Sequence, residues 1–544
     1  MTPHDADQAA PVATTLQRTV VPIPVPDGAP KLLPYELAKY AEHGYGRWSY
    51  GPGLACERRL DLLSGGRDAA AHAGGTAAPP ASAAAPLLRF FTITDIHITD
   101  VQSPSQAILF GYKGFLSSAY SGVMLYTHHV LDAAVRTVNA LHRDQSIDFG
   151  ISLGDTCNTT QYNELRWYID VLDGRRIDPD SGVRPEGERG RRGAFLAPYD
   201  ATGLDASIPW FQVRGNHDHF WTGFLRVDDY LRQAYVGEEI LNMGNVFEDP
   251  LGPDSRGFYM GSLDGSTEYG DIYGMGPVAS FATPPKVKAA DPDRRSLSKS
   301  EWMAEFFTTT SDLKGHGLDA ARVDAGFACY TFEPKAGVPL RVIVLDDTQR
   351  DDDPYDNGYG HISLDKERHD WLIAELDRGQ ADGMLMVIAA HCPIGVEKVP
   401  GPMAWSSSAF GSEEDLLAKL HTYPNLILWI AGHRHCNAVT AFPSPDAARP
   451  ELGFWEVETS SLRDFPQQLR LFEIVRDAED TVSILATDVD TDVADGEPAA
   501  TSRTYAVAAQ QIFANPVGLL PTGSYNAELV VPLSAEMRAL LDRA

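Results

Sequence analysis

Chemically reactive residues are concentrated in five short groups between residues 95 and 435 of this 544-residue chain. The groups are Asp95-x-His97, Gly154-Asp155, Gly215-Asn216-His217-Asp218, His391 and Gly432-His433-x-His435. Each directly follows a run of apolar, mostly β-favouring residues. We therefore expect each group at a strand end, where an open α/β sheet builds its sites. Imidazole, carboxylate and amide groups are metal ligands, and paired ions promote phosphate-ester hydrolysis. Two-metal hydrolysis is the predicted chemistry.

The spacing within the groups suits metal ligation. Asp95 and His97 follow the run FFTIT, and residues two apart in a strand face the same way, so both can aim at one ion. Asp155 ends ISLGD, where the preceding glycine permits a tight turn and the carboxylate can bridge two cations. His433 and His435 can each offer an imidazole to a different ion, with the second ring nitrogen fixed by neighbouring groups.

Taken singly, each group also has an ordinary structural explanation. Gly154-Asp155 is typical of a turn, and His217-Asp218 of a buried structural pair. A lone His391 at a strand end is more often a hydrogen-bonded structural residue than a ligand. Chance explains poorly why five such groups occur in one order, each after an apolar run.

The ordered set resembles the calcineurin-like metallophosphoesterase superfamily, whose motifs run D-x-H, G-D, G-N-H-[DE], H and G-H-x-H. All five are present without substitution, and the resemblance covers about residues 87–440. The segments AEHGYGRWSYGPG and ETSSLRDFPQQ also resemble an uncharacterised bacterial branch of that superfamily. The resemblance implies an α/β fold, the calcineurin-like four-layer α-β-β-α sandwich with two mixed sheets, here carrying long insertions.

The resemblance also implies roles for individual residues. The first metal ion would be held by Asp95, His97, Asp155 and His435. Asp155 would bridge to a second ion, held also by Asn216, His391 and His433. The catalytic acid would be His217, oriented by Asp218. The cofactors would be two divalent or trivalent ions of Mn, Fe or Zn, and a hydroxide bridging them would attack phosphorus in line.

Three branches of the superfamily fit less well. Purple acid phosphatases carry Tyr three residues after the bridging Asp, where this chain has Asn158. Protein Ser/Thr phosphatases continue G-D-x-x-D-R-G, whereas residues 154–160 read GDTCNTT. DNA-repair nucleases need a DNA-binding surface, which a net charge of −30 disfavours. The remaining substrate is a small-molecule phosphodiester or phosphomonoester, and the motifs do not distinguish the two.

Composition limits the partners. With 75 acidic against 45 basic residues, the chain repels nucleic-acid backbones and anionic membranes. We therefore expect a small phosphorylated substrate, no nucleic acid and no membrane, and the oligomeric state stays undetermined. Five Cys without a CxxC motif do not indicate a disulfide scaffold. Neither a signal peptide nor an apolar stretch of eighteen residues is evident, so a cytoplasmic location is expected.

Strand–helix alternation predicts the order of the elements. Strands are expected at residues 87–94, 147–153, 208–213, 340–345, 385–390, 426–431, 454–458, 469–475 and 481–489. Helices are expected at 130–141, 363–377 (with Ser363 as the cap), 506–512 and 535–541. The predicted organisation is an N-terminal arm at 1–65 packing on the core, a flexible Ala/Gly/Pro linker at 66–86, a metallophosphoesterase domain at 87–490 and a C-terminal extension at 491–544. Insertions at about 157–207 and 219–335 are expected to form a lid or rim.

Two other functions stay open from the sequence. A metal-dependent hydrolase of a non-phosphate ester or amide would use the same ions. A non-catalytic binding protein that retains the fold would be expected to have lost at least one ligand, and none is lost.

Overall fold

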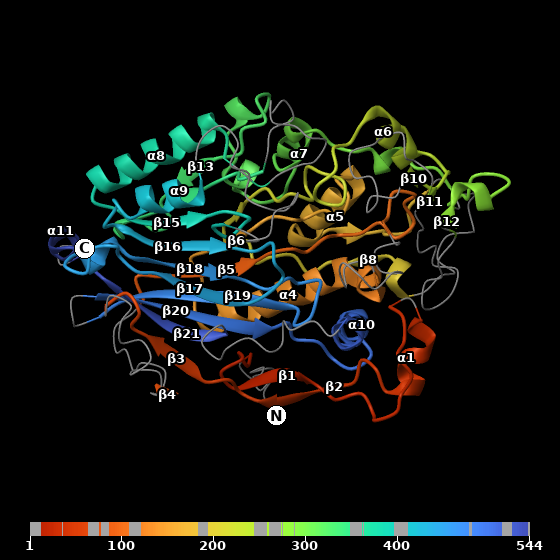
Figure 1. The fold of residues 1–544 in the computed structure, drawn as a ribbon, viewed down its shortest axis with the longest axis horizontal. Helices are drawn as coiled ribbons and strands as arrows, with labels where there is room; N and C mark the ends of the chain where they lie inside the picture. Colours follow the sequence, from red (N-terminus) through yellow and green to blue (C-terminus); the bar gives the residue numbers. More distant parts are fainter. Residues whose placement is uncertain are drawn as a thin grey trace, which may run out of the picture.

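Two large mixed sheets organise the chain in the structure, a computed structural model (Figure 1). The structure describes residues 12–34, 36–63, 76–77, 86–107, 121–182, 194–243, 258–259, 274, 276–287, 289–348, 362, 364–395, 412–477, 481–513 and 525–541. Within these ranges, no helix combines the length and the apolar character needed to span a membrane.

The first sheet has eight strands, ordered β4-β3-β21-β20-β19-β5-β6-β9. Its strands are β3 (Cys56–Arg59), β4 (Thr76–Ala77), β5 (Leu88–Ile93), β6 (Phe149–Ser152), β9 (Trp210–Gln212), β19 (Gln468–Arg476), β20 (Thr481–Asp490) and β21 (Asn526–Pro532). β5, β6 and β9 run parallel, whereas β19, β20 and β21 are antiparallel neighbours. Every residue of β5 is buried, as expected of a strand covered on both faces.

The second sheet has six strands, ordered β13-β14-β15-β16-β18-β17. They are β13 (Tyr330–Phe332), β14 (Leu340–Val344), β15 (Leu385–Ala389), β16 (Leu426–Ala431), β17 (Ala438–Phe442) and β18 (Phe454–Glu458). β14, β15, β16 and β18 are parallel, and the two edge strands are antiparallel. The predicted strands at 426–431 and 454–458 have the observed bounds.

Alternate residues of β14 face two different cores. Val342 and Val344 belong to the cluster that also contains Phe472 and Ile474 of β19, so this face packs with the eight-stranded sheet. Ile343 belongs to a separate cluster with residues of the outer helices. This two-residue period follows from the strand pleat, and it places the six-stranded sheet between the other sheet and a helical layer.

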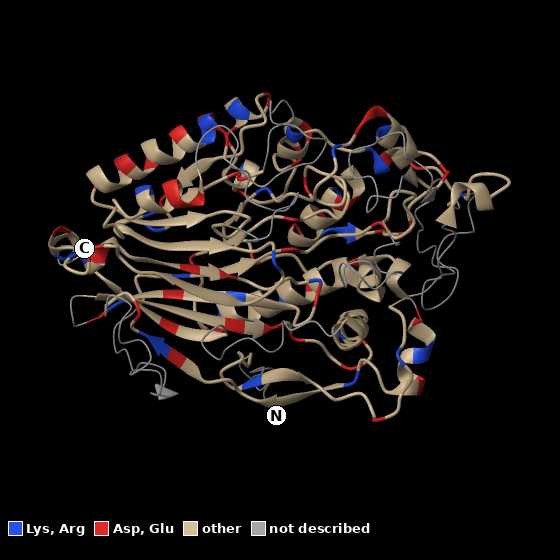
Figure 2. Cartoon of the chain, viewed as in Figure 1, with Lys and Arg blue, Asp and Glu red and all other residues tan. Residues whose placement is uncertain are grey.

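The helical layer consists of α8 (Lys366–Ala381) and α9 (Glu413–Leu420), which lie along the outer side of β15 and β16 in Figure 1. Figure 2 shows acidic and basic residues distributed along α8. Its Leu372 and Leu376 are fully buried. Asp365 caps α8 by accepting a hydrogen bond from Arg368 N. The predicted cap, Ser363, lies outside the described residues.

Two further helices pack into the main core. α4 (Thr127–Asp144) includes the predicted helix at 130–141, and its Val130, Ala134, Val138 and Leu141 are buried. α5 (Tyr162–Leu172) belongs to the first insertion, and its Leu165 and Ile169 lie in the same core cluster as Phe472. Part of that insertion is therefore a core element. The other helices are α1 (Leu37–His43), α6 (Asp229–Val236), α7 (Lys299–Glu305), α10 (Pro498–Phe513) and α11 (Ala535–Leu541).

Short elements complete the described chain. The strands are β1 (Arg18–Pro22), β2 (Trp48–Pro52), β7 (Arg176–Ile177), β8 (Tyr199–Asp200), β10 (Asn242–Met243), β11 (Phe258–Tyr259) and β12 (Gly276–Pro277). The 3-10 turns are η2 (Gly122–Tyr126), η3 (Ala194–Leu196), η4 (Val278–Ser280), η5 (Pro292–Arg294), η6 (Lys314–Gly317), η7 (Ala320–Arg322) and η8 (Pro450–Leu452).

The N-terminal segment and the C-terminal segment contact each other and the large sheet. Thr15 N donates to Asp488 O at 3.0 Å, and Val20 N donates to the Asp490 carboxylate at 3.0 Å. Tyr40 of α1 packs edge-on against Tyr505 of α10. β21, from the segment we expected to be an extension, lies between β20 and β3 in the eight-stranded sheet. The expected linker at 66–86 lies outside the described residues except for residues 76–77 and 86.

Candidate metal centre

The five sequence groups come together where the carboxyl ends of parallel strands of both sheets meet. Asp95 follows β5, Asp155 follows β6 and Asn216 follows β9, three adjacent parallel strands. His391 follows β15 and His433 follows β16, which are parallel neighbours in the other sheet. Both sheets therefore contribute side chains to one site, in agreement with the general position of sites in α/β sheets.

The backbone at this site is unusual. Nine described residues other than glycine have positive φ, and five of them belong to the groups: Asp95 (51°), His97 (47°), Asp155 (53°), His433 (70°) and His435 (55°). Left-handed backbone is costly for side-chain-bearing residues and is concentrated at functional sites. The shared direction of Asp95 and His97 therefore comes from a left-handed loop after β5. The strand alternation we predicted for this pair is wrong, because β5 ends at Ile93.

In the carboxylates of Asp95 and Asp155, hydrogen bonds to one of the two oxygens fix the orientation of the group. Asp95 Oδ2 accepts from the Thr94 hydroxyl at 2.7 Å and from His433 N at 2.9 Å. Asp155 Oδ1 accepts from His217 N at 2.8 Å. The second oxygen of each carboxylate is thereby directed into the space between the imidazoles.

One set of possible ligand atoms surrounds His97 Nε2. It lies 3.2 Å from His435 Nε2, 3.5 Å from Asp155 Oδ2 and 3.9 Å from Asp95 Oδ1. His435 Nε2 is 3.3 Å from Asp95 Oδ1. These four residues are the predicted first set.

A second set surrounds the side-chain oxygen of Asn216. This oxygen lies 2.8 Å from His391 Nε2 and 3.2 Å from His433 Nδ1, and its orientation is fixed because Asn216 Nδ2 donates to Gly223 O. His391 Nε2 is also 3.4 Å from Asp155 Oδ2. Asp155 Oδ2 therefore lies within 3.5 Å of a donor atom in each set.

The spacing of these atoms fits metal ligation. Two atoms bound about 2.1 Å from one tetrahedral ion lie about 3.4 Å apart, and several donor pairs here are 3.2–3.5 Å apart. Asp95 Oδ1 is buried and accepts no well-formed hydrogen bond from the described residues. Three-residue groups able to hold an ion include Asp95, His97 and His435, and Asp95, Asp155 and His391. Buried groups of this chain can therefore hold metal ions.

Cys392 was not among the predicted ligands, yet its sulfur lies close enough to His391 and His433 to form another such group. Its side chain is fully buried, and burial raises the pKa of the thiol well above its ordinary value. The thiolate form that binds metal is thus disfavoured. The packing role expected of a small buried residue fits Cys392 better.

Three imidazoles are oriented through their second nitrogen. His391 Nδ1 lies 2.8 Å from Leu153 O, and His435 Nδ1 lies 2.5 Å from the Asp464 carboxylate. His217 Nδ1 lies 2.9 Å from Asn158 O. Such contacts fix the tautomer and leave Nε2 for the metal or the substrate.

The Asp218 carboxylate accepts several hydrogen bonds beside the candidate centre. Its Oδ1 accepts from Thr156 N at 2.9 Å, from the Thr156 hydroxyl at 2.5 Å and from Cys157 N at 3.0 Å. Its Oδ2 accepts from Gly215 N at 2.9 Å. The implied orientation of His217 by Asp218 stays a prediction, and the hydrogen bonds of Asp218 hold the loop that follows Asp155.

Two glycines allow the chain segments to approach closely. A Cβ on Gly215 would lie 2.2 Å from Asp155 N and from Asp155 Oδ1. A Cβ on Gly432 would lie 2.0 Å from the Thr94 hydroxyl oxygen and 2.6 Å from Asp95 Oδ2. The glycines in the G-N-H-D and G-H-x-H groups are therefore required for steric reasons at the carboxylates.

The carboxylates and imidazoles shift each other's protonation. Burial opposes protonation of His391, but the neighbouring Asp155 carboxylate raises the pKa of His391 to about 10. Burial likewise opposes protonation of His435. The carboxylates of Asp95 and Asp464 favour protonation, and the pKa of His435 is raised to about 10. Burial and the charge on His391 lower the pKa of His433 to about 3. Despite burial, the imidazoles of His391, His217 and His97 hold the pKa of Asp155 well below its ordinary value. The carboxylates are thus ionised and suited to bind cations.

Sequence reasoning missed the segment that connects β18 to β19. Its Ser461 hydroxyl donates to Asp95 O at 2.7 Å, and its Asp464 contacts His435. Arg463 Nη1 donates to Asn158 Oδ1 at 2.6 Å. This segment belongs to ETSSLRDFPQQ, which we used only as a sign of resemblance, because no residue in it has ligand spacing.

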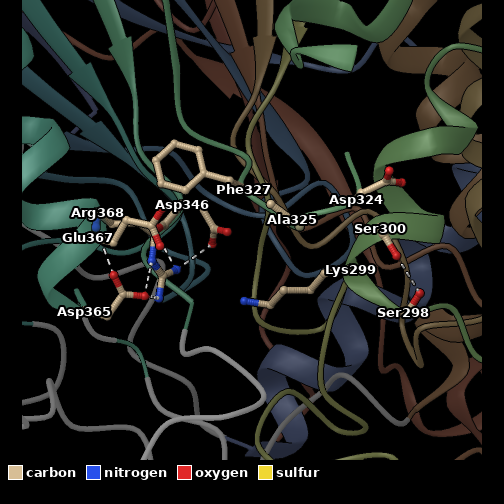
Figure 3. A pocket seen from close by; sticks show the side chains of 11 residues that line it. Ser298, Lys299, Ser300, Asp324, Ala325, Phe327, Asp346, Asp365, Glu367 and Arg368 are labelled. Carbon is tan, nitrogen blue, oxygen red and sulfur yellow. Dashed lines mark hydrogen bonds and ion pairs between the residues drawn. The ribbon is translucent and has the colours of Figure 1, made fainter. Parts of the chain in front are cut away.

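A cavity of about 410 Å³ lies beside the buried ion pair of Arg214 and Asp346, the residues that precede Gly215 and follow β14. Arg368 also contacts Asp346, at 3.3 Å. Figure 3 shows Lys299 lying across this cavity, with its ammonium end toward the Asp365–Arg368 side. The ion pair with Asp346 therefore anchors Arg214 just after the end of β9, two residues before Asn216.

Comparisons with known proteins add little. Neither a protein-family model nor a curated protein matches the chain. Among solved structures, a dimetal phosphatase from Danio rerio aligns with 75% of this chain and 100% of its own length, at 12% sequence identity and a TM-score of 0.37. At this TM-score the alignment establishes no function, so the side chains of the site must carry the functional inference.

Proposed function

We propose that this chain is a dinuclear metal-dependent hydrolase of a small-molecule phosphate ester, either a phosphodiester or a phosphomonoester. The observation that carries the proposal is the position of Asp155 Oδ2. It lies 3.5 Å from His97 Nε2 and 3.4 Å from His391 Nε2, between two separate sets of donor atoms. A carboxylate shared in this way suits a pair of ions better than a single ion.

The proposed ligands are the seven residues predicted from the motifs. One ion would be held by Asp95, His97, Asp155 and His435, and the other by Asp155, Asn216, His391 and His433. The donors are nitrogen and oxygen atoms, which accept Mn, Fe and Zn. When bound, such a pair supplies Lewis-acid activation of the phosphoryl group and of water.

His217 is the proposed proton donor to the leaving oxygen. One ring nitrogen of His217 forms a group with ligand atoms of His97 and Asp155, and these three atoms lie within 4.8 Å of one another. Because its Nδ1 faces Asn158 O, its Nε2 is the nitrogen available to the leaving group. His217 is half-buried, whereas His97 and His391 are buried, so His217 lies on the side of the centre that a substrate can reach.

The resemblance to calcineurin-like metallophosphoesterases belongs to this proposal. In that fold the two sheets would form the inner layers of a four-layer α-β-β-α sandwich. The shared core of β14 and β19 and the outer position of α8 and α9 support three of these layers. We further propose a small phosphorylated partner, consistent with the formal charge of −30.

The test combines metal analysis with a substrate comparison. The protein is loaded separately with Mn, Zn and Fe, and assayed with bis(p-nitrophenyl) phosphate, p-nitrophenyl phosphate and p-nitrophenyl acetate. The proposal expects two ions per chain and turnover of at least one phosphate ester. An Asp155→Asn variant should lose the two-ion occupancy and the turnover. Turnover of the acetate alone would identify a non-phosphate esterase. Metal binding without any turnover would indicate a binding protein.

A further inference from the structure

The segment between β18 and β19 crosses the proposed centre and contacts it at three points. Ser461 donates to the carbonyl of Asp95, and Asp464 contacts His435 Nδ1. The third contact, from Arg463 to Asn158, does not reach a proposed ligand. It leads to His217, because Asn158 O lies 2.9 Å from His217 Nδ1.

Asn158 is a fully buried junction of hydrogen bonds. Its side-chain Nδ2 donates to Gln106 Oε1 at 2.7 Å, and its Oδ1 accepts from Arg463 Nη1 at 2.6 Å. Its backbone N lies 3.1 Å from both Glu164 Oε2 and Ile98 O. With both ends of the side-chain amide and the peptide nitrogen held, the Asn158 carbonyl has one orientation, and that orientation fixes the His217 ring.

Arg463, which donates to Asn158, is a buried residue. Its side chain is only 1% exposed, so its hydrogen bond to Asn158 is shielded from solvent. The contact between Arg463 and Asn158 therefore lies in the interior, beside the proposed proton donor.

We propose that Arg463 is a positioning residue for the proton donor: it fixes Asn158, and Asn158 holds the His217 ring with Nε2 toward the leaving group. This inference rests on the proposed function of His217. Arg463 acts through Asn158 and not on the metal ligands. Removing it should therefore impair proton donation and leave the metal in place.

The main experiment compares leaving groups. Proton donation matters most for esters of poorly acidic alcohols. An Arg463→Met variant should lose about 10- to 100-fold in kcat on an alkyl phosphate ester and much less on the p-nitrophenyl ester, with two ions retained. Arg463→Lys should recover part of the loss. An increase in KM with unchanged kcat would instead show that Arg463 binds the substrate, and would overturn the proposal.

Asn158→Ala tests the connection, because it removes the side-chain amide and keeps the backbone carbonyl. It should reproduce the leaving-group effect, and the Arg463→Met/Asn158→Ala double variant should be no worse than either single variant. Additive losses of activity would contradict the proposal that Arg463 acts through Asn158. Arg166→Met is the matched control: Arg166 is 9% exposed and contacts Asp170 and Glu305, away from the centre. It should lower rates on both esters equally or not at all.

A readout without turnover separates this inference from the proposed function. In protein labelled with ¹⁵N-histidine, the His217 Nδ1–H signal should shift or broaden in Arg463→Met, while the His391 signal stays unchanged. An unchanged His217 signal would overturn the positioning role even if the enzyme is active. If the wild type hydrolyses no phosphate ester, a shifted signal would still support the contact, and only the catalytic role would be lost.

Discussion

The carboxylate of Asp464 lies 2.5 Å from Nδ1 of His435, and Nε2 of the same ring lies 3.3 Å from Asp95 Oδ1. A carboxylate behind a ligating imidazole fixes the ring and increases its basicity, and losing such a partner typically costs 10- to 100-fold in metal affinity. We expect Asp464→Ala to weaken one of the two sites by about that factor, and Asp464→Asn by less, because an amide oxygen can still accept the hydrogen bond.

Isothermal titration with Zn and Mn measures both affinities. Asp477→Asn is the control, because Asp477 accepts hydrogen bonds from Thr481 and Ser483 at the far end of β19. Equal affinities in wild type and Asp464→Ala would contradict a contribution of Asp464 to metal binding.

Gly432→Ala should disturb the carboxylate of Asp95. The added Cβ would lie 2.0 Å from the Thr94 hydroxyl oxygen and 2.6 Å from Asp95 Oδ2, an oxygen held by two hydrogen bonds. Overpacking of this kind costs about 1–3 kcal/mol, and here the shift also moves a ligand. We expect a bound-metal content below two ions per chain, measured by plasma mass spectrometry. Gly237→Ala is the control, because its Cβ would meet nothing closer than 3.5 Å.

Metal removal should lower thermal stability, since ions that bind only the folded chain stabilise it by mass action. An ion at 100 times its dissociation constant contributes about 2.7 kcal/mol. Differential scanning calorimetry of chelated and Zn-reloaded protein should show a higher Tm after reloading. The gain should be smaller in Asp155→Asn, which alters the shared carboxylate. If the wild-type Tm were the same with and without metal, this would argue against metal binding at the centre.

The sequence indicated the position of the candidate centre because each group follows an apolar, mostly β-favouring run, which is typical of a buried strand. The strand at 426–431 has the predicted bounds for this reason, as LILWIA is uninterrupted and a Gly-His turn follows. β21 was missed because it begins with Asn526 and contains Glu528, which read as polar although both are buried.

The orientation of the side chains at the candidate centre could not be predicted from the sequence. The contact that orients His217 comes from a backbone carbonyl, and a carbonyl of Asn158 has no signature among residue types. The resemblance implied Asp218 for this role, but the Asp218 oxygens accept from backbone N–H groups near Asp155. Arg463 is 305 positions from its partner Asn158, so only the folded chain brings the two together.

A buried histidine outside the centre predicts acid sensitivity. His316 is fully buried, stacks on Trp210 with ring centroids 3.4 Å apart, and places Nδ1 3.1 Å from Trp210 O. Burial lowers the pKa of His316 to about 4, with a smaller opposing effect of Asp173 and a reinforcing one of Lys314. The unfolded chain takes up the proton near pH 6.5, and the folded chain only near pH 4.

Between those values the unfolded state binds more protons, so stability falls as the pH decreases from about 6.5 to about 4. At about 1.36 kcal/mol per pKa unit, His316 accounts for up to about 3 kcal/mol of this loss. We expect His316→Asn to be less stable at neutral pH and to have a shallower slope of unfolding free energy against pH. Asn is chosen because the φ of 48° is left-handed, which Asn tolerates. The measurement is urea unfolding of both proteins at several pH values with chelator present, so that loss of metal contributes equally. Parallel slopes would mean that His316 is protonated in the folded protein, against the burial seen here.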